Sequence, residues 1–187
     1  MRKPFEMDPH VLIAAAETED EIGAVLRAHL CTEQFLNWFI RVRTEGEMST
    51  FVKEPRDFRA KLSLAVALAL PLPFAGAIHQ INVIRNGLAH RLDALDSSQV
   101  EEFARQVNKL SPLAPDFAPL SSRYITLEQK RPGVKIAFGS EGPRIDFIIA
   151  SFALLATATV WSHSLLAYMD SPEWHRMTTA RYTPPAT

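Results

Sequence analysis

The stretch INVIRNGLAHRL, residues 81–92, holds two arginines, two asparagines and a histidine within twelve positions. On an ideal helix, with about 100° per residue, its apolar and polar side chains separate onto two faces. One face holds Ala77, Ile81, Ile84, Leu88 and Leu92, and the opposite face holds His79, Asn82, Asn86, His90 and Asp93. The pattern predicts a two-sided helix over about residues 75–93, with Arg85 at the border of the polar face.

Helical patterns recur along most of the remaining chain. Residues 18–43 begin with the acidic run TEDE and then place apolar side chains at intervals of three to five. The run FRAKLSLAVALAL, residues 58–70, follows a capping Asp57, is almost continuously apolar and ends at Pro71. Further helices are predicted over residues 8–17, with Asp8 as the cap, over residues 97–110, with a serine cap, and over residues 144–169.

Residues 111–144 have a different composition, with three prolines in the first nine positions. YITLE and VKIAF are rich in β-forming residues and flank QKRPG, which predicts a small β-hairpin near residues 123–138 around a Pro-Gly turn. The predicted fold class is therefore mainly all-α, a helical bundle of long antiparallel helices with this one hairpin. Residues 1–170 are expected to form a single helical domain, and residues 171–187 a tail that is partly mobile.

The overall composition is that of a globular protein, with 47% hydrophobic and 22% charged residues. A formal net charge of -1 excludes a global attraction to nucleic acid, so RNA binding would need a local basic patch. Cys31 is the only cysteine and lies in an apolar helical pattern, which favours a buried thiol in a reducing compartment. Because MRKPFEMDPH lacks the apolar run of a signal peptide, a cytoplasmic location is expected.

One segment, residues 147–169, contains no Asp, Glu, Lys or Arg and is long enough to span a bilayer. It also carries several hydroxyl side chains and His163, and its flanks lack the Lys/Arg asymmetry that orients a membrane span. A helix that is apolar all round must be buried in something. A core helix or a dimer-interface helix is therefore favoured over a membrane anchor, which remains the alternative.

The polar face of the 75–93 helix offers groups suited to metal-independent RNA cleavage. The reference pKa of histidine lies near neutrality, so His90 can act as a base on a ribose 2′-hydroxyl or as an acid on the leaving oxygen. Arg85 can donate to the charge that builds on phosphate oxygens, and Asn86 can orient His90 or the phosphate. This chemistry requires no metal and no cofactor. Other candidates for the same cleft are His79, Asn82, Glu33, Asn37 and Arg91.

Arg85 and His90 are about 140° apart on an ideal helical wheel. They converge on one atom only if Arg85 reaches around the helix, or if a second copy of the helix supplies the matching pair. A two-fold interface brings the same patch of two subunits together. The spacing therefore points to a composite site in a homodimer. The competing interpretation is a structural polar cluster that holds two helices or two subunits together.

RNGLAH resembles the Arg-x4-His motif of the HEPN superfamily of helical proteins, in which a polar residue often follows the arginine. The order of IGAVLRAHLCTEQFLNWFI, DFRAKLSLAVALALPLP and INVIRNGLAHRLD, within residues 18–110, also resembles the mannitol-repressor-like (MltR-like) helical family. The resemblance implies that RNA-cleaving relatives would use Arg85 and His90, with Asn86 as the polar neighbour. It also implies a dimer, and a partner such as a nucleotidyltransferase-type antitoxin or a role in phage defence.

Two functions follow as expectations. The first is a metal-independent endoribonuclease of the toxin or phage-defence type, acting as a homodimer on RNA. The second is a non-catalytic regulator or protein-interaction module of the mannitol-repressor kind, in which the same helix contacts a second subunit or a partner protein. The sequence contains no helix-turn-helix with an evident basic recognition helix, so direct operator binding is the weakest form of the second function.

Overall fold

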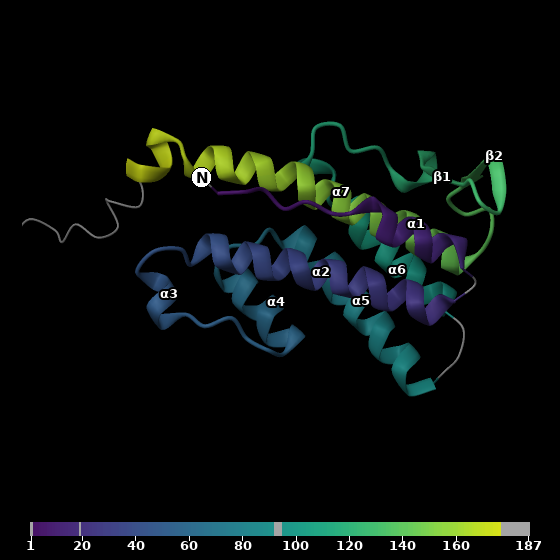
Figure 1. Ribbon diagram of the computed structural model, residues 1–187, viewed down its shortest axis with the longest axis horizontal. Coiled ribbons are helices and arrows are strands. Elements are labelled where there is room, and N and C mark those ends of the chain that lie inside the picture. Colours follow the sequence, from purple (N-terminus) through teal and green to yellow (C-terminus); the bar gives the residue numbers. More distant parts are fainter. Residues whose placement is uncertain (1, 19, 92–94, 177–187) are drawn as a thin grey trace, which may run out of the picture.

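The computed structural model describes residues 2–18, 20–91 and 95–176, without the side chains of residues 89–91. Most of this described chain is helical, and its sheet is one antiparallel hairpin (Figure 1). The predicted fold class, mainly α with a small hairpin, is confirmed. The helices are α1 (Pro9–Glu17), α2 (Glu21–Arg43), α3 (Met48–Phe51), α4 (Phe58–Ala67), α5 (Leu72–Arg91), α6 (Ser97–Asn108) and α7 (Pro143–Met169), with short 3-10 turns at Ser111–Leu113 and Leu120–Ser122.

Helices α2 and α5 pack antiparallel at the centre of the bundle. The rings of Phe35 on α2 and Phe74 on α5 lie 5.3 Å apart between centroids. Further along, His29 on α2 meets Asn82 on α5, so residue numbers fall on one helix as they rise on the other. The predicted apolar face of α5 is buried as far as it is described, with exposed fractions of 0–7% at Ala77, Ile81, Ile84 and Leu88. Leu92 and Asp93 lie outside the described residues.

Helix α7 is the long apolar core helix. It is long and apolar enough to cross a membrane, with a mean hydropathy of 1.7 in its most apolar window, but 67% of that window is buried inside the molecule. It packs against α1, α2 and α6. The hydroxyls of Ser151 and Thr157 donate to the carbonyls of Phe147 and Ala153, one turn earlier, at 2.8 and 2.7 Å. These bonds satisfy the polar groups within the helix, which therefore suits a protein core.

An N-terminal arm completes the core before α1 begins. It runs between α2 and α7 in Figure 1. The backbone N–H of Phe5 donates to Ser162 Oγ at 3.0 Å, and the indole N–H of Trp38 donates to the carbonyl of Lys3 at 2.9 Å. The Phe5 ring meets the Phe35 ring edge-on at 5.2 Å. The arm thus closes the groove between two long helices, a contact that no local pattern in the sequence indicated.

Aspartates cap four of the helices. Asp8 and Asp57 accept from the N–H groups of His10 and Ala60 at 2.9 and 3.0 Å, as predicted. At α2 the cap is Asp20, which lies within the run TEDE that was expected to begin the helix. The prediction was wrong at α6, where Asp96 caps the helix instead of the predicted serine. A carboxylate adds a favourable charge at the positive end of a helix, and this advantage explains the aspartate at both positions.

The connection between α4 and α5 is tighter than predicted. Helix α4 ends at Ala67 rather than near Leu70, because Ala69 takes a left-handed conformation with φ of 69°. Helix α5 begins at Leu72, so Pro73 lies in its first turn rather than before it. Proline is tolerated there because the first N–H groups of a helix have no acceptor within it. The predicted connector of residues 44–56 also contains α3.

The hairpin pairs β1 (Tyr124–Leu127) with β2 (Arg131–Ala137) at one end of the bundle (Figure 1). The predicted position of the turn, at Pro132 and Gly133, was wrong. Residues 128–130 make the turn, and Pro132 and Gly133 lie within β2. Gly133 has a φ of 72°, and the pairing register shifts after Thr126. A bulge of this kind accommodates a proline, which has no N–H to offer the sheet. Of the predicted tail, residues 172–176 are helical and residues 177–187 lie outside the described residues.

Candidate functional site

A polar cavity of about 290 Å³ lies where α2, α5 and the start of α4 meet. Four residues expected in the cleft line it: Glu33, Asn82, Arg85 and Asn86. Five further residues line it that the sequence did not single out: His29, Arg56, Asp57, Phe58 and Arg59. The structure therefore brings together half of the predicted site and adds a histidine and two arginines to it.

The α5 side of the cavity is partly buried. Asn82 is 7% exposed and faces α2 rather than solvent, so the polar face of α5 is not wholly open. The Nη1 group of Arg85 donates to Oδ1 of Asn86 at 3.0 Å. The amide oxygen of Asn86 is thus bound by its neighbour in sequence, which orients the guanidinium. The side chains of His90 and Arg91 lie outside the described residues, although both positions belong to α5.

The Glu33 carboxylate is already paired. Nζ of Lys61, on α4, lies 2.7 Å from Glu33 and 3.5 Å from Glu54. The Lys61 side chain is only 7% exposed, which is unusual for a lysine and requires a charged partner. This pair neutralises the negative charge of Glu33 inside the cavity. Glu33 therefore positions Lys61 and α4, and is poorly suited to act as a free base.

His29 is the group in the cavity best suited to proton transfer. Its ring stacks on Phe58 with centroids 4.2 Å apart, and its buried Nε2 has no hydrogen-bond partner among the described residues. Burial lowers the pKa of His29, and Arg85 lowers it further, while Asn82 and Glu33 oppose the shift. The imidazole is therefore neutral near pH 7. Its position four residues before Glu33 places both on one helix face, a signal that could have identified it.

Three arginines, Arg56, Arg59 and Arg85, give the cavity a positive character. None of them has a carboxylate within ion-pair distance in the described part of the chain. The one other acid in the lining, Asp57, uses its carboxylate to cap α4. The N-terminus of α4 adds a partial positive charge at the same point. A phosphate group is a ligand that this arrangement would attract.

Two of the residues predicted in the cleft do not line it. Asn37 lies one turn beyond Glu33 on α2, and because α2 and α5 are antiparallel this turn faces the beginning of α5 rather than Arg85. Its Oδ1 is buried without a hydrogen-bond partner among the described residues. His79 is exposed and lies about 9 Å along α5 from Arg85, too far to reach the same ligand atom.

The lowered pKa of His29 predicts a pH dependence of stability. The unfolded chain binds the proton with a pKa near 6.5, above the folded value, so lowering the pH through that region destabilises the fold. Above about pH 7.5 both states are neutral at this residue and its contribution vanishes. The urea midpoint is expected to fall less between pH 8 and pH 5 in His29→Gln than in the wild type. His10→Gln, which changes an exposed histidine, is the matched control. If the urea midpoint of His29→Gln fell as far as that of the wild type, the assignment of this pH dependence to His29 would be contradicted.

The described residues contain no group of three or more His, Cys, Asp or Glu side chains that could hold a metal ion. Cys31 is buried, as expected, and burial raises the pKa of its thiol. The chain matches no family model, no curated protein and no solved structure.

Proposed function

We propose that this chain is a HEPN-like, RNA-binding protein and a metal-independent endoribonuclease. The main support for this proposal is the cavity in which three arginines without carboxylate partners in the described part of the chain surround a neutral, partly buried histidine, His29. A site with this composition suits a phosphodiester, which offers oxygens to the arginines and a hydroxyl proton to the imidazole. The resemblance of residues 85–90 to the Arg-x4-His motif supports the same proposed function and adds His90 to the proposed catalytic residues.

Phosphate binding is the role proposed for the arginines. Arg85 is held by Asn86 and lies beside Asn82, so its guanidinium enters the cavity from α5. Arg56 and Arg59 flank the cap of α4 and enter from the other wall. Two guanidinium groups on opposite walls can bind two oxygens of one phosphate, or two successive phosphates of an RNA strand.

Cleavage would follow the usual course for a phosphodiester next to a 2′-hydroxyl. His29 takes the 2′-hydroxyl proton, the 2′ oxygen forms a bond to phosphorus, and the bond from phosphorus to the 5′ oxygen breaks. His90 is the proposed acid, which gives a proton to the departing 5′ oxygen. The products are a 2′,3′-cyclic phosphate and a 5′-hydroxyl end. Arg85 stabilises the added charge on the phosphoryl oxygens.

A homodimer in the cytoplasm is part of the proposal. Ile22, Leu26 and Leu30 are 41%, 42% and 56% exposed and recur every four residues along α2. They form an apolar stripe next to His29, on a helix that also lines the cavity. A second copy seated on this stripe would cover it and place two cavities side by side, which fits the composite site expected from the sequence. An antitoxin of the toxin-pair type would be a further partner.

The test uses purified protein and a labelled single-stranded RNA of about 20 nucleotides. The wild type is expected to release fragments with 2′,3′-cyclic phosphate ends. Arg85→Ala is expected to lower the rate by about 100-fold or more, as for loss of one donor to a developing charge. His29→Gln and His90→Ala are expected to do the same. Arg105→Ala is the matched control, because that exposed arginine on α6 pairs with Glu102 away from the cavity.

RNA binding provides a second readout. Replacing Arg56, Arg59 and Arg85 with Gln is expected to weaken binding and to reduce the salt dependence by about one phosphate contact per arginine. If RNA binds the wild type and the triple variant equally, the nucleic-acid proposal fails. Binding without cleavage would instead favour the non-catalytic regulator. That alternative draws on the paired state of Glu33 and the buried position of Asn82, both of which also suit a structural cluster.

A further inference from the structure

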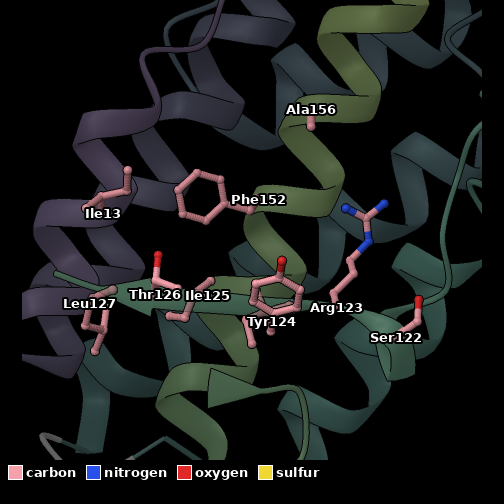
Figure 2. A pocket seen from close by; sticks show the side chains of 11 residues that line it. Ile13, Ser122, Arg123, Tyr124, Ile125, Thr126, Leu127, Phe152 and Ala156 are labelled. Atoms are coloured by element: carbon pink, nitrogen blue, oxygen red, sulfur yellow. The ribbon is translucent and has the colours of Figure 1, made fainter. Parts of the chain in front are cut away.

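A second cavity, of about 470 Å³, lies at the hairpin end of the molecule, apart from the polar cavity. Its apolar wall comes from Ile13 of α1 and from Ile149, Phe152 and Ala156 of α7. Strand β1 forms the opposite wall, and Figure 2 shows the Phe152 ring facing it. No acidic residue is among those that line this cavity.

Strand β1 presents a free backbone edge to this cavity. Among the described residues β1 pairs with β2 alone, and just beyond β2 the N–H of Phe138 donates to the carbonyl of Arg123 at 3.0 Å. In an antiparallel pair the residues alternate, so Ile125 also points its N–H and C=O toward β2. The N–H and C=O groups of Tyr124 and Thr126 then point away from β2, and they have no hydrogen-bond partner in the described part of the chain. Such an edge is a template for another strand.

Arg123 stands at the start of this edge. Its Nε donates to the carbonyl of Ala118 at 2.9 Å, and its guanidinium lies 5.2 Å from the centre of the Phe117 ring. These contacts fix the side chain while leaving its two terminal amino groups without a partner among the described residues. Figure 2 shows the guanidinium of Arg123, the residue before β1, on the same side of the strand as the hydroxyl of Thr126. Burial without a carboxylate lowers the pKa of Arg123, as expected for a cation that lacks its anion.

We propose that this cavity binds the C-terminal segment of an extended peptide, which adds to β1 as an antiparallel strand. In that direction the free carboxylate of the peptide falls next to Arg123, whereas a parallel peptide would place its amino end there. The backbone of the peptide forms hydrogen bonds with the N–H and C=O groups of Tyr124 and Thr126. One apolar side chain of the peptide enters the cavity and packs against Phe152 and Ile13. A simple fatty acid would use Arg123 and the apolar wall but would leave the strand edge unpaired.

The test measures fluorescence anisotropy with a labelled set of hexapeptides whose last three positions are Ala, Val, Leu, Ile or Phe. The free-acid set is expected to bind saturably. Amidation of the C-terminus, Arg123→Gln, or N-methylation of the last three backbone amides is each expected to weaken binding at least about tenfold. Ala156→Trp, at an exposed position of the wall, is expected to block binding without loss of folding. Arg105→Gln should leave the affinity unchanged.

Several results would overturn this proposal. The proposal fails if the free-acid peptides show no saturable binding, or if the acids and the amides bind equally. It also fails if Arg123→Gln and Ala156→Trp both fold and both bind the peptides as tightly as the wild type. N-methylated peptides that bind as well as the originals would refute strand addition. Binding of decanoate that depends on Arg123, without binding of any peptide, would assign the cavity to small apolar acids instead. RNA cleavage does not enter these measurements, so they stand or fall apart from the proposed nuclease.

Discussion

Replacing Phe35 with alanine is expected to lower the free energy of unfolding by about 3–5 kcal/mol. Phe35 is 1% exposed, and its ring contacts the rings of Phe5, Phe74 and Trp161 at centroid distances of 5.2, 5.3 and 6.2 Å. These partners come from the N-terminal arm, α5 and α7. The alanine would therefore leave a void where four segments meet, and none of them could close it alone.

Denaturant unfolding followed by far-ultraviolet circular dichroism would measure this loss, because tryptophans near the cluster make fluorescence an ambiguous signal. Phe51→Ala is the matched control, since Phe51 on α3 is 86% exposed and its removal should change stability by no more than about 0.5 kcal/mol. Phe35→Leu should lose less than the alanine variant. A loss in Phe35→Ala below about 1 kcal/mol would show that the cluster relaxes around the gap and does not join the four segments.

The helices themselves follow from local pattern. The apolar face of α5 was predicted from its spacing, and Ala77, Ile81, Ile84 and Leu88 are buried as that spacing requires. Helix α7 was predicted as a core helix because its hydroxyl groups and flanks did not suit a bilayer, and it lies in the core. Spacing determines which face of a helix is apolar, so these features depend on nearby residues alone.

Only some of the residues that line the candidate site could be predicted from the sequence, because tertiary contacts bring the others to the cavity. Glu33 and Asn82 share polar positions on α2 and α5, and antiparallel packing brings them together. Arg56 and Arg59 enter the cavity because α4 packs against α2 and brings the start of α4 to this place, and the spacing of the two arginines in the sequence gives no sign of this. Lys61 falls within a run that is predicted to be almost continuously apolar, yet its ammonium group forms an ion pair with Glu33, which lines the cavity.

The second cavity was missed for a different reason. The hairpin was predicted, but its place against α1 depends on contacts between segments more than 100 residues apart, such as the backbone N–H of Gln129, in the hairpin turn, donating to the Glu17 carboxylate at 3.1 Å. A strand edge is free or covered according to what packs beside it. No feature of YITLE could show that its edge would face a cavity.

Lys61→Met is the second change expected to have a large effect, on both stability and the cavity. Removing one partner of a buried ion pair leaves an uncompensated charge and costs about 3–5 kcal/mol when both partners are fully buried. The Glu33 side chain is 26% exposed, so water reduces that penalty, and a loss of about 2–3 kcal/mol is expected. Chemical denaturation measures it, with the exposed Lys53→Met as the control.

The same variant should weaken anion binding, because the unpaired carboxylate of Glu33 would lie in the cavity with Arg85. RNA affinity is therefore expected to fall in Lys61→Met and to recover in the double variant Lys61→Met, Glu33→Gln, although the lysine itself does not line the cavity. Stability should also recover in part, since the double variant removes both charges. If the double variant were no better than the single one in either measurement, Lys61 would not be the counter-ion of Glu33. If stability recovered but RNA affinity did not, the ion pair would hold α4 to α2 without setting the charge of the cavity.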